Sequence, residues 1–165
     1  MIELGVTGDT HDLVRPELLD ALIGVHAIVH VGDVCDAPTL AALSDIAPVT
    51  AVRGNNDVEP FASTLPEARL VRFEQVALWL CHDANDLQRL PPPEDAALVV
   101  VGHSHKPVLE ARPHFTLLNP GSPGRRRFSL PVCCARVTIN DNRFTARHVH
   151  LNVPPPKQRS RRTSP

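Results

Sequence analysis

Three short apolar segments in the first third of the chain constrain the fold more than any other feature. Residues 2–7, 27–31 and 49–52 form these segments, and each is followed within two positions by a glycine and then by a polar residue. Between them, residues 16–23 and 38–46 place apolar side chains at helical intervals, as in helices that pack on a sheet. This strand-helix-strand-helix-strand order predicts a parallel sheet with right-handed crossovers.

The rest of the chain predicts more strands, with fewer helices between them. Residues 68–73 and 76–81 form two strands around a tight turn, a short helix is expected at 85–90, and 97–101 is a Val-rich strand. Further strands are predicted at 107–112, 115–118, 130–139 and 143–151. We expect the four strands after residue 106 to be antiparallel and to form a second sheet against the first.

The composition is that of one globular domain. The 165 residues are 42% hydrophobic and 21% charged, with a net charge of −1. Four of the 17 basic residues lie within positions 157–165, where there is no acid, so the remainder has 13 basic and 18 acidic residues. We expect one domain over residues 1–153 and a disordered basic, Pro- and Arg-rich tail over residues 154–165.

Composition also bounds the expected partners and location. Aromatic residues make up 4% of the chain, and the domain is acidic, so nucleic acid is not the expected partner. No apolar run approaches the length of a membrane span, so we expect no membrane partner. Four cysteines without CxxC spacing suit reduced thiols in a cytoplasmic protein. An exposed edge of the second sheet would allow two chains to form a homodimer.

Polar residues with metal-binding side chains follow the predicted strands. Because the carboxyl ends of parallel strands meet at one edge of a sheet, we expect these side chains to converge. The candidate ligands are Asp9, His11, Asp33, Asn55, His82, His103 and His105. Imidazole, carboxylate and amide ligands without a thiolate suit Mn, Fe, Co, Ni or Zn. Seven ligands exceed the need of one tetrahedral ion and predict two divalent ions, with Mn as the expected metal.

The histidine pair His103 and His105 supports this prediction only together with the other five candidate ligands. In a chain with nine histidines, about half a His-x-His pair is expected by chance alone. His148 and His150 have the same spacing and match no other strand-end ligand, so we leave them out of the site.

These residues resemble the signature blocks of a known family. The calcineurin-like metallophosphoesterases carry, in the same order, blocks similar to Asp9-Thr10-His11, Gly32-Asp33, Gly54-Asn55-Asn56-Asp57, His82 and Gly102-His103-Ser104-His105. The small single-domain phosphodiesterase branch has a further block that resembles Asn119-Pro120-Gly121-Ser122. The resemblance implies an α/β (α+β) fold, a four-layer αββα sandwich of two mixed β-sheets flanked by helices.

The resemblance also implies a ligand assignment and a reaction. One ion would be held by Asp9, His11 and His105. The second would be completed by Asn55, His82 and His103, with Asp33 bridging the two. Two divalent ions and two carboxylates leave a net positive site that suits a small phosphoester substrate. The implied reaction is hydrolysis of a phosphodiester by a metal-bridging hydroxide held by Asp33.

Some positions depart from the family's pattern or await a role. Asn56 stands where larger members have a general-acid histidine, which lowers the expected turnover of unactivated esters and leaves Asn56 as a substrate contact. Asp83 replaces the glycine that usually follows the ligand histidine and is expected to narrow the site or to add negative charge beside it. Asp57 is expected to accept a hydrogen bond from a ligand imidazole, with a simple turn role as the alternative. Within the run of three arginines, Arg125 is expected to clamp a substrate phosphate.

Two alternative functions are compatible with the same fold. A phosphomonoesterase of the same fold would differ in its outer pocket, which the sequence does not describe. A protein-interaction scaffold resembling the retromer subunit would keep the fold and lack a full set of ligands. All seven ligand positions hold competent side chains here, so the sequence favours a hydrolase.

Overall fold

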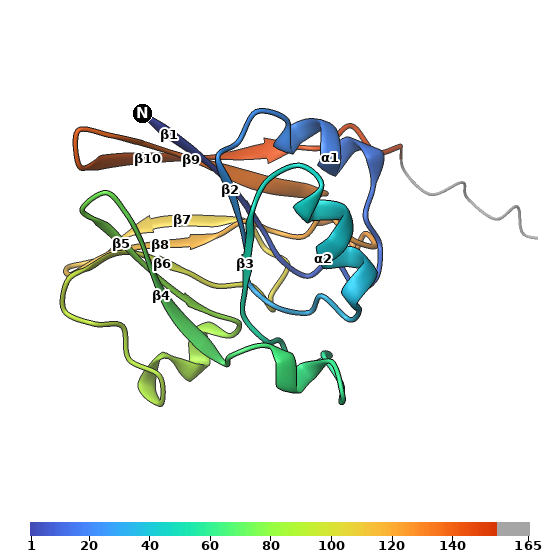
Figure 1. The fold of residues 1–165 in the computed structure, drawn as a ribbon, viewed down its shortest axis with the longest axis horizontal. Coiled ribbons are helices and arrows are strands. Elements are labelled where there is room, and N and C mark those ends of the chain that lie inside the picture. Colours follow the sequence, from blue (N-terminus) through green and yellow to red (C-terminus); the bar gives the residue numbers. More distant parts are fainter. Residues whose placement is uncertain (155–165) are drawn as a thin grey trace, which may run out of the picture.

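The computed structural model describes residues 1–154 and contains two five-stranded sheets packed face to face (Figure 1). In the first sheet, β1 (Ile2–Thr7), β2 (Ala27–His30) and β3 (Val49–Ala51) are parallel, which confirms the prediction for the start of the chain. The predicted disordered tail, apart from Pro154, lies outside the described residues.

A hairpin from the end of the chain completes the first sheet, so the prediction that the C-terminal strands join the second sheet was wrong. β9 (Cys133–Asn140) pairs antiparallel with β1, and β10 (Arg143–His150) pairs with β9. The resulting order is β10-β9-β1-β2-β3. β9 is apolar on the face that places Val137 in the core between the sheets, and at its start Cys134 enters the core under the helices. Such a strand is stable in the interior of a sheet that is covered on both sides.

The second sheet is mixed, in the order β4-β5-β6-β8-β7. Its strands are β4 (Ala68–Phe73), β5 (Val76–Cys81), β6 (Ala96–Val100), β7 (Val108–Ala111) and β8 (Thr116–Asn119). The outer pairs are antiparallel, but β5, β6 and β8 are parallel. The expectation of an antiparallel second sheet is therefore wrong at its centre. Because β5 and β6 run the same way, the residues that follow them emerge at one edge.

Helices cover the outer face of the first sheet (Figure 1). α1 (Pro16–Leu22) and α2 (Ala37–Ser44) bury Leu18 and Leu43 there. The side chain of Asp36 accepts a hydrogen bond from the backbone N–H of Thr39 at 2.9 Å and so caps α2. The two-sheet core with helices on this side confirms the α/β sandwich.

The outer face of the second sheet has a much thinner cover. In the described part of the chain it consists of the 3-10 helix η2 (Ala84–Gln88), whose Leu87 packs on the cluster that contains Val99 and Leu117. An α-helix was expected at 85–90. The side chain of Asp83 caps the segment by accepting from the backbone N–H of Asn85 at 2.9 Å. Another short 3-10 helix, η1 (Ala62–Thr64), lies in the connection between the sheets.

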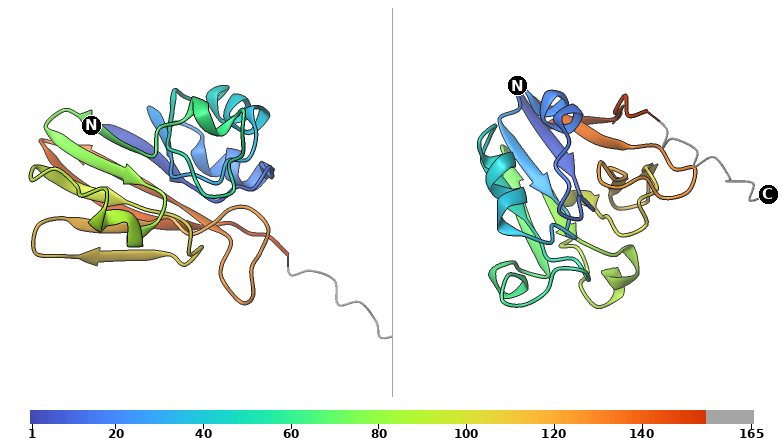
Figure 2. Two further views of the ribbon diagram at one scale, coloured as in Figure 1. Left: turned by 90° about the horizontal axis from the view of Figure 1, so that it is seen from below. Right: turned by 90° about the vertical axis from the view of Figure 1, so that its right-hand side faces the viewer.

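The core between the sheets sets their relative position (Figure 2). Leu4 and Val29 of the first sheet pack in one cluster with Leu78 and Leu98 of the second, and all four are fully buried. No helix within residues 1–154 is long and apolar enough to cross a membrane. β4 and β7 are the edge strands of the second sheet, and pairing of two chains at such an edge remains a prediction.

Candidate metal centre

The seven predicted ligands come from loops at the carboxyl ends of five strands. The first sheet supplies Asp9, His11, Asp33 and Asn55, and the second supplies His82, His103 and His105. The sequence argument placed these strand ends in one parallel sheet. In the sandwich, ligands instead reach the centre from two opposed sheets, and contacts between the two sets bring all seven together.

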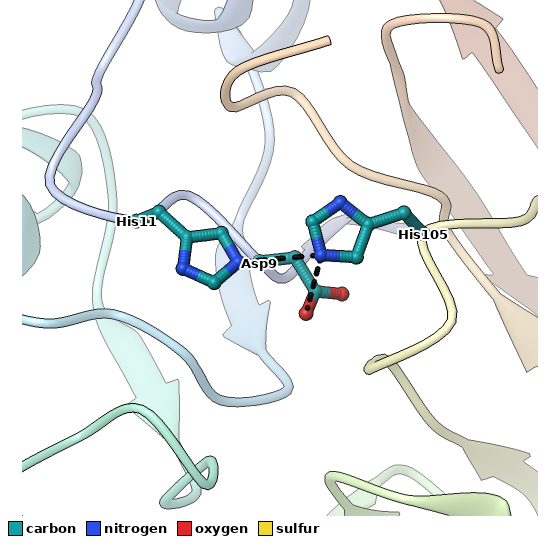
Figure 3. Close-up of side chains that lie close together, drawn as sticks. All are labelled: Asp9, His11 and His105. Atoms are coloured by element: carbon teal, nitrogen blue, oxygen red, sulfur yellow. Dashed lines mark hydrogen bonds and ion pairs between the residues drawn. The ribbon is translucent and has the colours of Figure 1, made fainter. Parts of the chain in front are cut away.

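One group of ligands consists of Asp9, His11 and His105, whose ligand atoms lie within 4.8 Å of one another. The Nε2 atoms of His11 and His105 are 3.2 Å apart, and Nε2 of His105 is 3.4 Å from Oδ1 of Asp9 (Figure 3). Burial lowers the pKa of His11, and it lowers the pKa of His105 to about 4. Both rings are therefore neutral near pH 7 and can present nitrogen lone pairs to a shared cation.

A second, overlapping group consists of Asp9, Asp33 and His82. Oδ2 of Asp33 lies 3.4 Å from Nε2 of His82 and 3.7 Å from Nε2 of His11, between the two groups. Nδ1 of His82 faces the carbonyl oxygen of Val31 at 2.7 Å, which leaves Nε2 directed at Asp33. A backbone carbonyl thus orients this imidazole, as partners of metal-binding histidines commonly do.

Asn55 and His103 extend the second group towards solvent. Oδ1 of Asn55 is 3.0 Å from Nε2 of His82 and 2.9 Å from Nδ1 of His103. Nε2 of His103 lies 3.7 Å from Oδ2 of Asp83, so the residue that departs from the family pattern stands beside a predicted ligand. Asp83 thus places a carboxyl group beside His103, and its narrowing of the site stays a prediction.

Five of the seven ligand residues have a left-handed backbone conformation, although none is glycine. The φ angles are 51° for Asp9, 48° for His11, 54° for Asp33, 64° for His103 and 57° for His105. Such a conformation costs non-glycine residues about 1–3 kcal/mol each and persists where the surroundings hold it. The sharp turns aim each side chain inward at the end of its strand, so backbone strain is concentrated at this site.

Two glycines allow the ligand loops to approach closely. A Cβ atom at Gly102 would lie 2.9 Å from Oδ2 of Asp9, and one at Gly54 would collide with the backbone nitrogen of Asp33. Any larger residue would therefore separate the loops that carry the ligands. This explains the glycine that precedes the ligand in these segments.

The pKa values of the two buried carboxyl groups are shifted in opposite directions. Burial raises the pKa of Asp9 to about 7. Burial also acts on Asp33, but hydrogen bonds from His82 and Asn56 outweigh it and hold the pKa of this carboxyl well below its usual range. Asp33 is thus an anion at all ordinary pH values, whereas Asp9 needs a nearby cation to remain one at neutral pH.

The donors fit divalent metal ions. Oδ2 of Asp9 is buried, and no group in residues 1–154 donates a hydrogen bond to it. An unpaired buried carboxylate oxygen is costly, and a cation beside it would remove that cost. The surrounding donors are imidazole nitrogens and carboxylate or amide oxygens, a set suited to Mn, Fe, Co, Ni or Zn.

Asp57 supports the centre in a different way from the one expected. Its carboxylate accepts hydrogen bonds from the backbone N–H groups of Gly54 at 2.7 Å, Asp33 at 3.1 Å and Cys35 at 2.6 Å. The sequence had suggested that Asp57 accepts a hydrogen bond from a ligand imidazole, and the structure has no such bond among the described residues. Asp57 instead joins the loop that carries Asp33 to the loop that carries Asn55.

Asn56 contacts the central carboxylate directly. Its backbone N–H donates to Oδ1 of Asp33 and its side-chain amide donates to Oδ2, both at 2.8 Å. These bonds stabilise the ionised form of Asp33. The amide of Asn56 cannot act as a general acid in place of an imidazolium. In this structure Asn56 orients the carboxylate of Asp33, and its contact with substrate stays a prediction.

Arg127 is the arginine that lies against the ligands. Its Nη2 is 3.3 Å from Nε2 of His11. Arg125, which the sequence analysis selected, instead places Nη2 3.7 Å from Oδ1 of Asp12, and its side chain is 77% exposed. In a run of three arginines without regular structure, the sequence contained no signal to distinguish them.

Residues of the Asn119–Ser122 block fasten the ligand loops. The side-chain amide of Asn119 donates to the carbonyl of Gly102 at 2.7 Å and to Oγ of Ser104 at 3.1 Å. The hydroxyl of Ser122 donates to the carbonyl of Asp9 at 2.8 Å. The block thus ties together the loops after β1 and β6, a role that the resemblance did not specify.

A pocket opens beside Asn55, His82 and His103, and its outer wall is charged. Arg53 and Arg89 both pair with Glu67 there, at 2.8 and 2.7 Å. This pocket borders the candidate ligands directly. The carboxylate between the two guanidinium groups offsets much of their charge.

Comparison with known proteins agrees with this geometry. Residues 2–142 match the family model of the calcineurin-like phosphoesterase superfamily domain. A protein of Methanothermobacter thermautotrophicus, named a probable metallophosphoesterase, is 34% identical over 163 residues, covering 92% of this chain and 94% of that protein.

Solved structures share the fold at lower identity. A structure described as a novel archaeal phosphodiesterase superposes with a TM-score of 0.72 and 17% identity, covering 90% of this chain and all of that one. Vps29 of Chaetomium thermophilum superposes with a TM-score of 0.71 and 16% identity, covering 90% and 97%. The sandwich alone therefore does not distinguish these functions, but the family match over most of the sequence does establish descent. The chain belongs to the calcineurin-like phosphoesterase superfamily.

Proposed function

We propose that this protein is a phosphoric ester hydrolase that uses two divalent metal ions, with Mn as the native metal, to cleave phosphodiesters. The observation that carries the proposal is the pair of overlapping ligand groups, which share Asp9 and have Asp33 between them. Divalent ions held there supply Lewis-acid chemistry, since they lower the pKa of a bound water and offset charge on phosphate oxygens.

The protein's own groups prepare the site for this chemistry. Neutral imidazoles of His11 and His105 provide lone pairs, while the hydrogen bonds from Asn56 keep Asp33 ionised. Arg127 brings a guanidinium to the same cluster, where it can donate to a phosphate oxygen. The protein therefore supplies metal ligands, an anionic carboxylate between the two ligand groups, and the guanidinium group of Arg127.

The absence of a general acid limits the leaving group. Asn56 occupies the position from which larger members donate a proton, and its amide is engaged with Asp33. Without that acid, esters with a stable leaving group react best. The preference for diesters rests on the resemblance of Asn119-Pro120-Gly121-Ser122 to the block of the small phosphodiesterase branch.

The test is a metal-supplemented assay of the chelator-treated protein. We expect Mn²⁺ to restore hydrolysis of bis(4-nitrophenyl) phosphate, with a higher kcat/KM than for 4-nitrophenyl phosphate, and parallel assays with Fe²⁺, Co²⁺, Ni²⁺ and Zn²⁺ rank the metals. A higher kcat/KM for the monoester would replace the diester proposal with the phosphomonoesterase alternative.

A protein-interaction scaffold is the second candidate, because Vps29 shares the fold. The complete ligand set argues for the enzyme, and calorimetric titration with Mn²⁺ separates the two. Binding of two equivalents is expected. A protein that binds fewer than two and hydrolyses none of the esters would be assigned to the scaffold class.

A further inference from the structure

A cationic depression lies on the side of the metal centre where His11 is located. It is lined by Arg15, Arg125, Arg126, Val153 and Pro154. Three of these five side chains are guanidinium groups, and none of them is an acid. The described residues have a net negative formal charge, so this concentration of arginine is not a consequence of overall composition.

Neutral partners hold two of the arginines in place. Nε of Arg15 donates to the carbonyl of Pro123 at 2.9 Å and its Nη2 donates to the carbonyl of Gly124 at 3.1 Å. Nη2 of Arg126 donates to the carbonyl of Val153 at 2.9 Å. Backbone carbonyls fix the position of a guanidinium without cancelling its charge, and each group keeps further N–H donors for a ligand. Arg125 has an exposed pairing with Asp12 at 3.7 Å, which is weak.

The pocket beside Asn55, His82 and His103 differs in this respect. There Arg53 and Arg89 share Glu67 at 2.8 and 2.7 Å, and Nη2 of Arg89 is also 3.5 Å from Asp86. The arginines of that pocket are thus compensated by carboxylates. The two flanks of one centre therefore offer different environments to the two substituents of a phosphodiester.

The depression is coupled to the centre by its own loop. Arg127, the next residue in the run, reaches Nε2 of His11. The backbone N–H of Gly124 donates to Oγ of Ser122 at 3.2 Å, and that hydroxyl donates to the carbonyl of Asp9. A group bound in the depression would therefore lie in a constant relation to a phosphate bound at the ligands.

We propose that this depression binds a second phosphate group of the substrate. The preferred substrate is then a phosphodiester that carries a further phosphate on one flank, while its uncharged flank enters the pocket lined by Arg53 and Arg89. Guanidinium groups are suited to this ligand because two N–H groups can bind two phosphate oxygens at once. This inference rests on the proposed phosphodiesterase function.

The experiment compares matched thymidine diesters as probes. Thymidine 5′-(4-nitrophenyl phosphate) and thymidine 3′-(4-nitrophenyl phosphate), each with and without a phosphate on its other hydroxyl, present one scissile diester with a stable leaving group, with or without a second phosphate. With the Mn²⁺-loaded full chain, we expect at least about a tenfold higher kcat/KM for one phosphorylated form, as for a hydrogen-bonded ion pair. Arg126→Gln and Arg125→Gln should reduce this ratio towards one. Arg69→Gln, an exposed arginine of β4, makes the same charge change elsewhere and should keep the ratio.

The outcomes separate the two proposals. If neither added phosphate raises kcat/KM although bis(4-nitrophenyl) phosphate is hydrolysed, the depression does not bind a substrate phosphate and the proposed function stands. The same conclusion follows if both variants keep the wild-type ratio. If bis(4-nitrophenyl) phosphate is not hydrolysed either, both proposals fail.

Discussion

The loops after β1 and β2 each bring a buried aspartate to the metal centre, yet the two carboxylates are prepared very differently. Both oxygens of Asp33 accept hydrogen bonds from Asn56, and its pKa is held well below the usual range. Asp9 has one buried oxygen to which no group in the described chain donates a hydrogen bond, and its pKa is raised to about 7. The Asp33 loop is therefore held by the protein's own hydrogen bonds, whereas Asp9 would need a bound cation to be an anion at neutral pH.

Removal of Asp33 should have the largest effect, because Asp33 lies between both ligand groups. We expect Asp33→Ala to lower kcat/KM for bis(4-nitrophenyl) phosphate at least about a thousandfold, the scale of several kcal/mol that metal ions contribute. Calorimetric titration should show fewer than two equivalents of Mn²⁺. The matched control is Asp20→Ala on the exposed side of α1, which should leave both measurements unchanged. Equal activity of the two variants would disprove the central role of Asp33.

The electrostatic difference predicts a pH dependence for the metal-free protein. The pKa of Asp9 is raised from 3.8 to about 7 on folding, so the folded state binds more protons than the unfolded state in this range. The unfolding free energy should therefore fall as pH rises from about 4 to about 7, by at most about 4 kcal/mol from this group. Asp9→Asn should remove this decline.

Urea unfolding with a chelator at several pH values measures the effect as the difference between wild type and Asp9→Asn. Asp33 contributes in the opposite direction, because its lowered pKa gives stability that is lost as pH falls below the unfolded value. A difference between the two proteins that does not change with pH would contradict the raised pKa of Asp9.

Asp57→Asn tests whether the Asp33 loop is preformed by its hydrogen bonds. Three backbone N–H groups would lose a charged acceptor, so we expect a loss of about 1–3 kcal/mol in the unfolding free energy. Mn²⁺ affinity should fall about 10- to 100-fold. Asp141→Asn, in the exposed turn between β9 and β10, is the control and should stay within about 0.5 kcal/mol of wild type. Wild-type stability of Asp57→Asn would show that other contacts hold the loop.

Arg127→Gln probes the other end of the site, where the guanidinium faces His11. We expect about a tenfold lower kcat/KM, mainly through KM, because one charge-assisted contact to phosphate is lost. Steady-state kinetics with bis(4-nitrophenyl) phosphate check this, with Arg69→Gln as the charge-matched control. An unchanged KM would show that Arg127 does not contact the substrate phosphate.

The positions of the strands and the candidate ligands could be predicted from the sequence, because both depend on residues a few positions apart along the chain. The apolar segments around Leu4, Val29 and Leu78 are short and bounded by glycine or turn residues, and the polar residue after each is visible in the chain. Residue types at strand ends also indicate the chemistry of the site. These features depend on neighbours a few positions apart.

Sheet membership and the supporting contacts depended on the tertiary structure. β9 appeared as another strand of the second half, and only the structure places it beside β1, with Val137 and Ile139 in the core between the sheets. The role of Asp57 and the choice of Arg127 over Arg125 follow from contacts between residues far apart in the sequence. Neither residue type nor spacing encodes such contacts.

The sequence by itself thus determined the family, the seven candidate ligands and the class of metal they suit. The packing of two sheets decided how those ligands divide into overlapping groups, and which carboxylate is an anion before the metal arrives. The physical reason is that a pKa depends on burial and on hydrogen-bond partners. Asp9 and Asp33 follow similar strands and similar glycines in the sequence, and only the folded chain places Asn56 against one of them and leaves an oxygen of the other without a donor among residues 1–154.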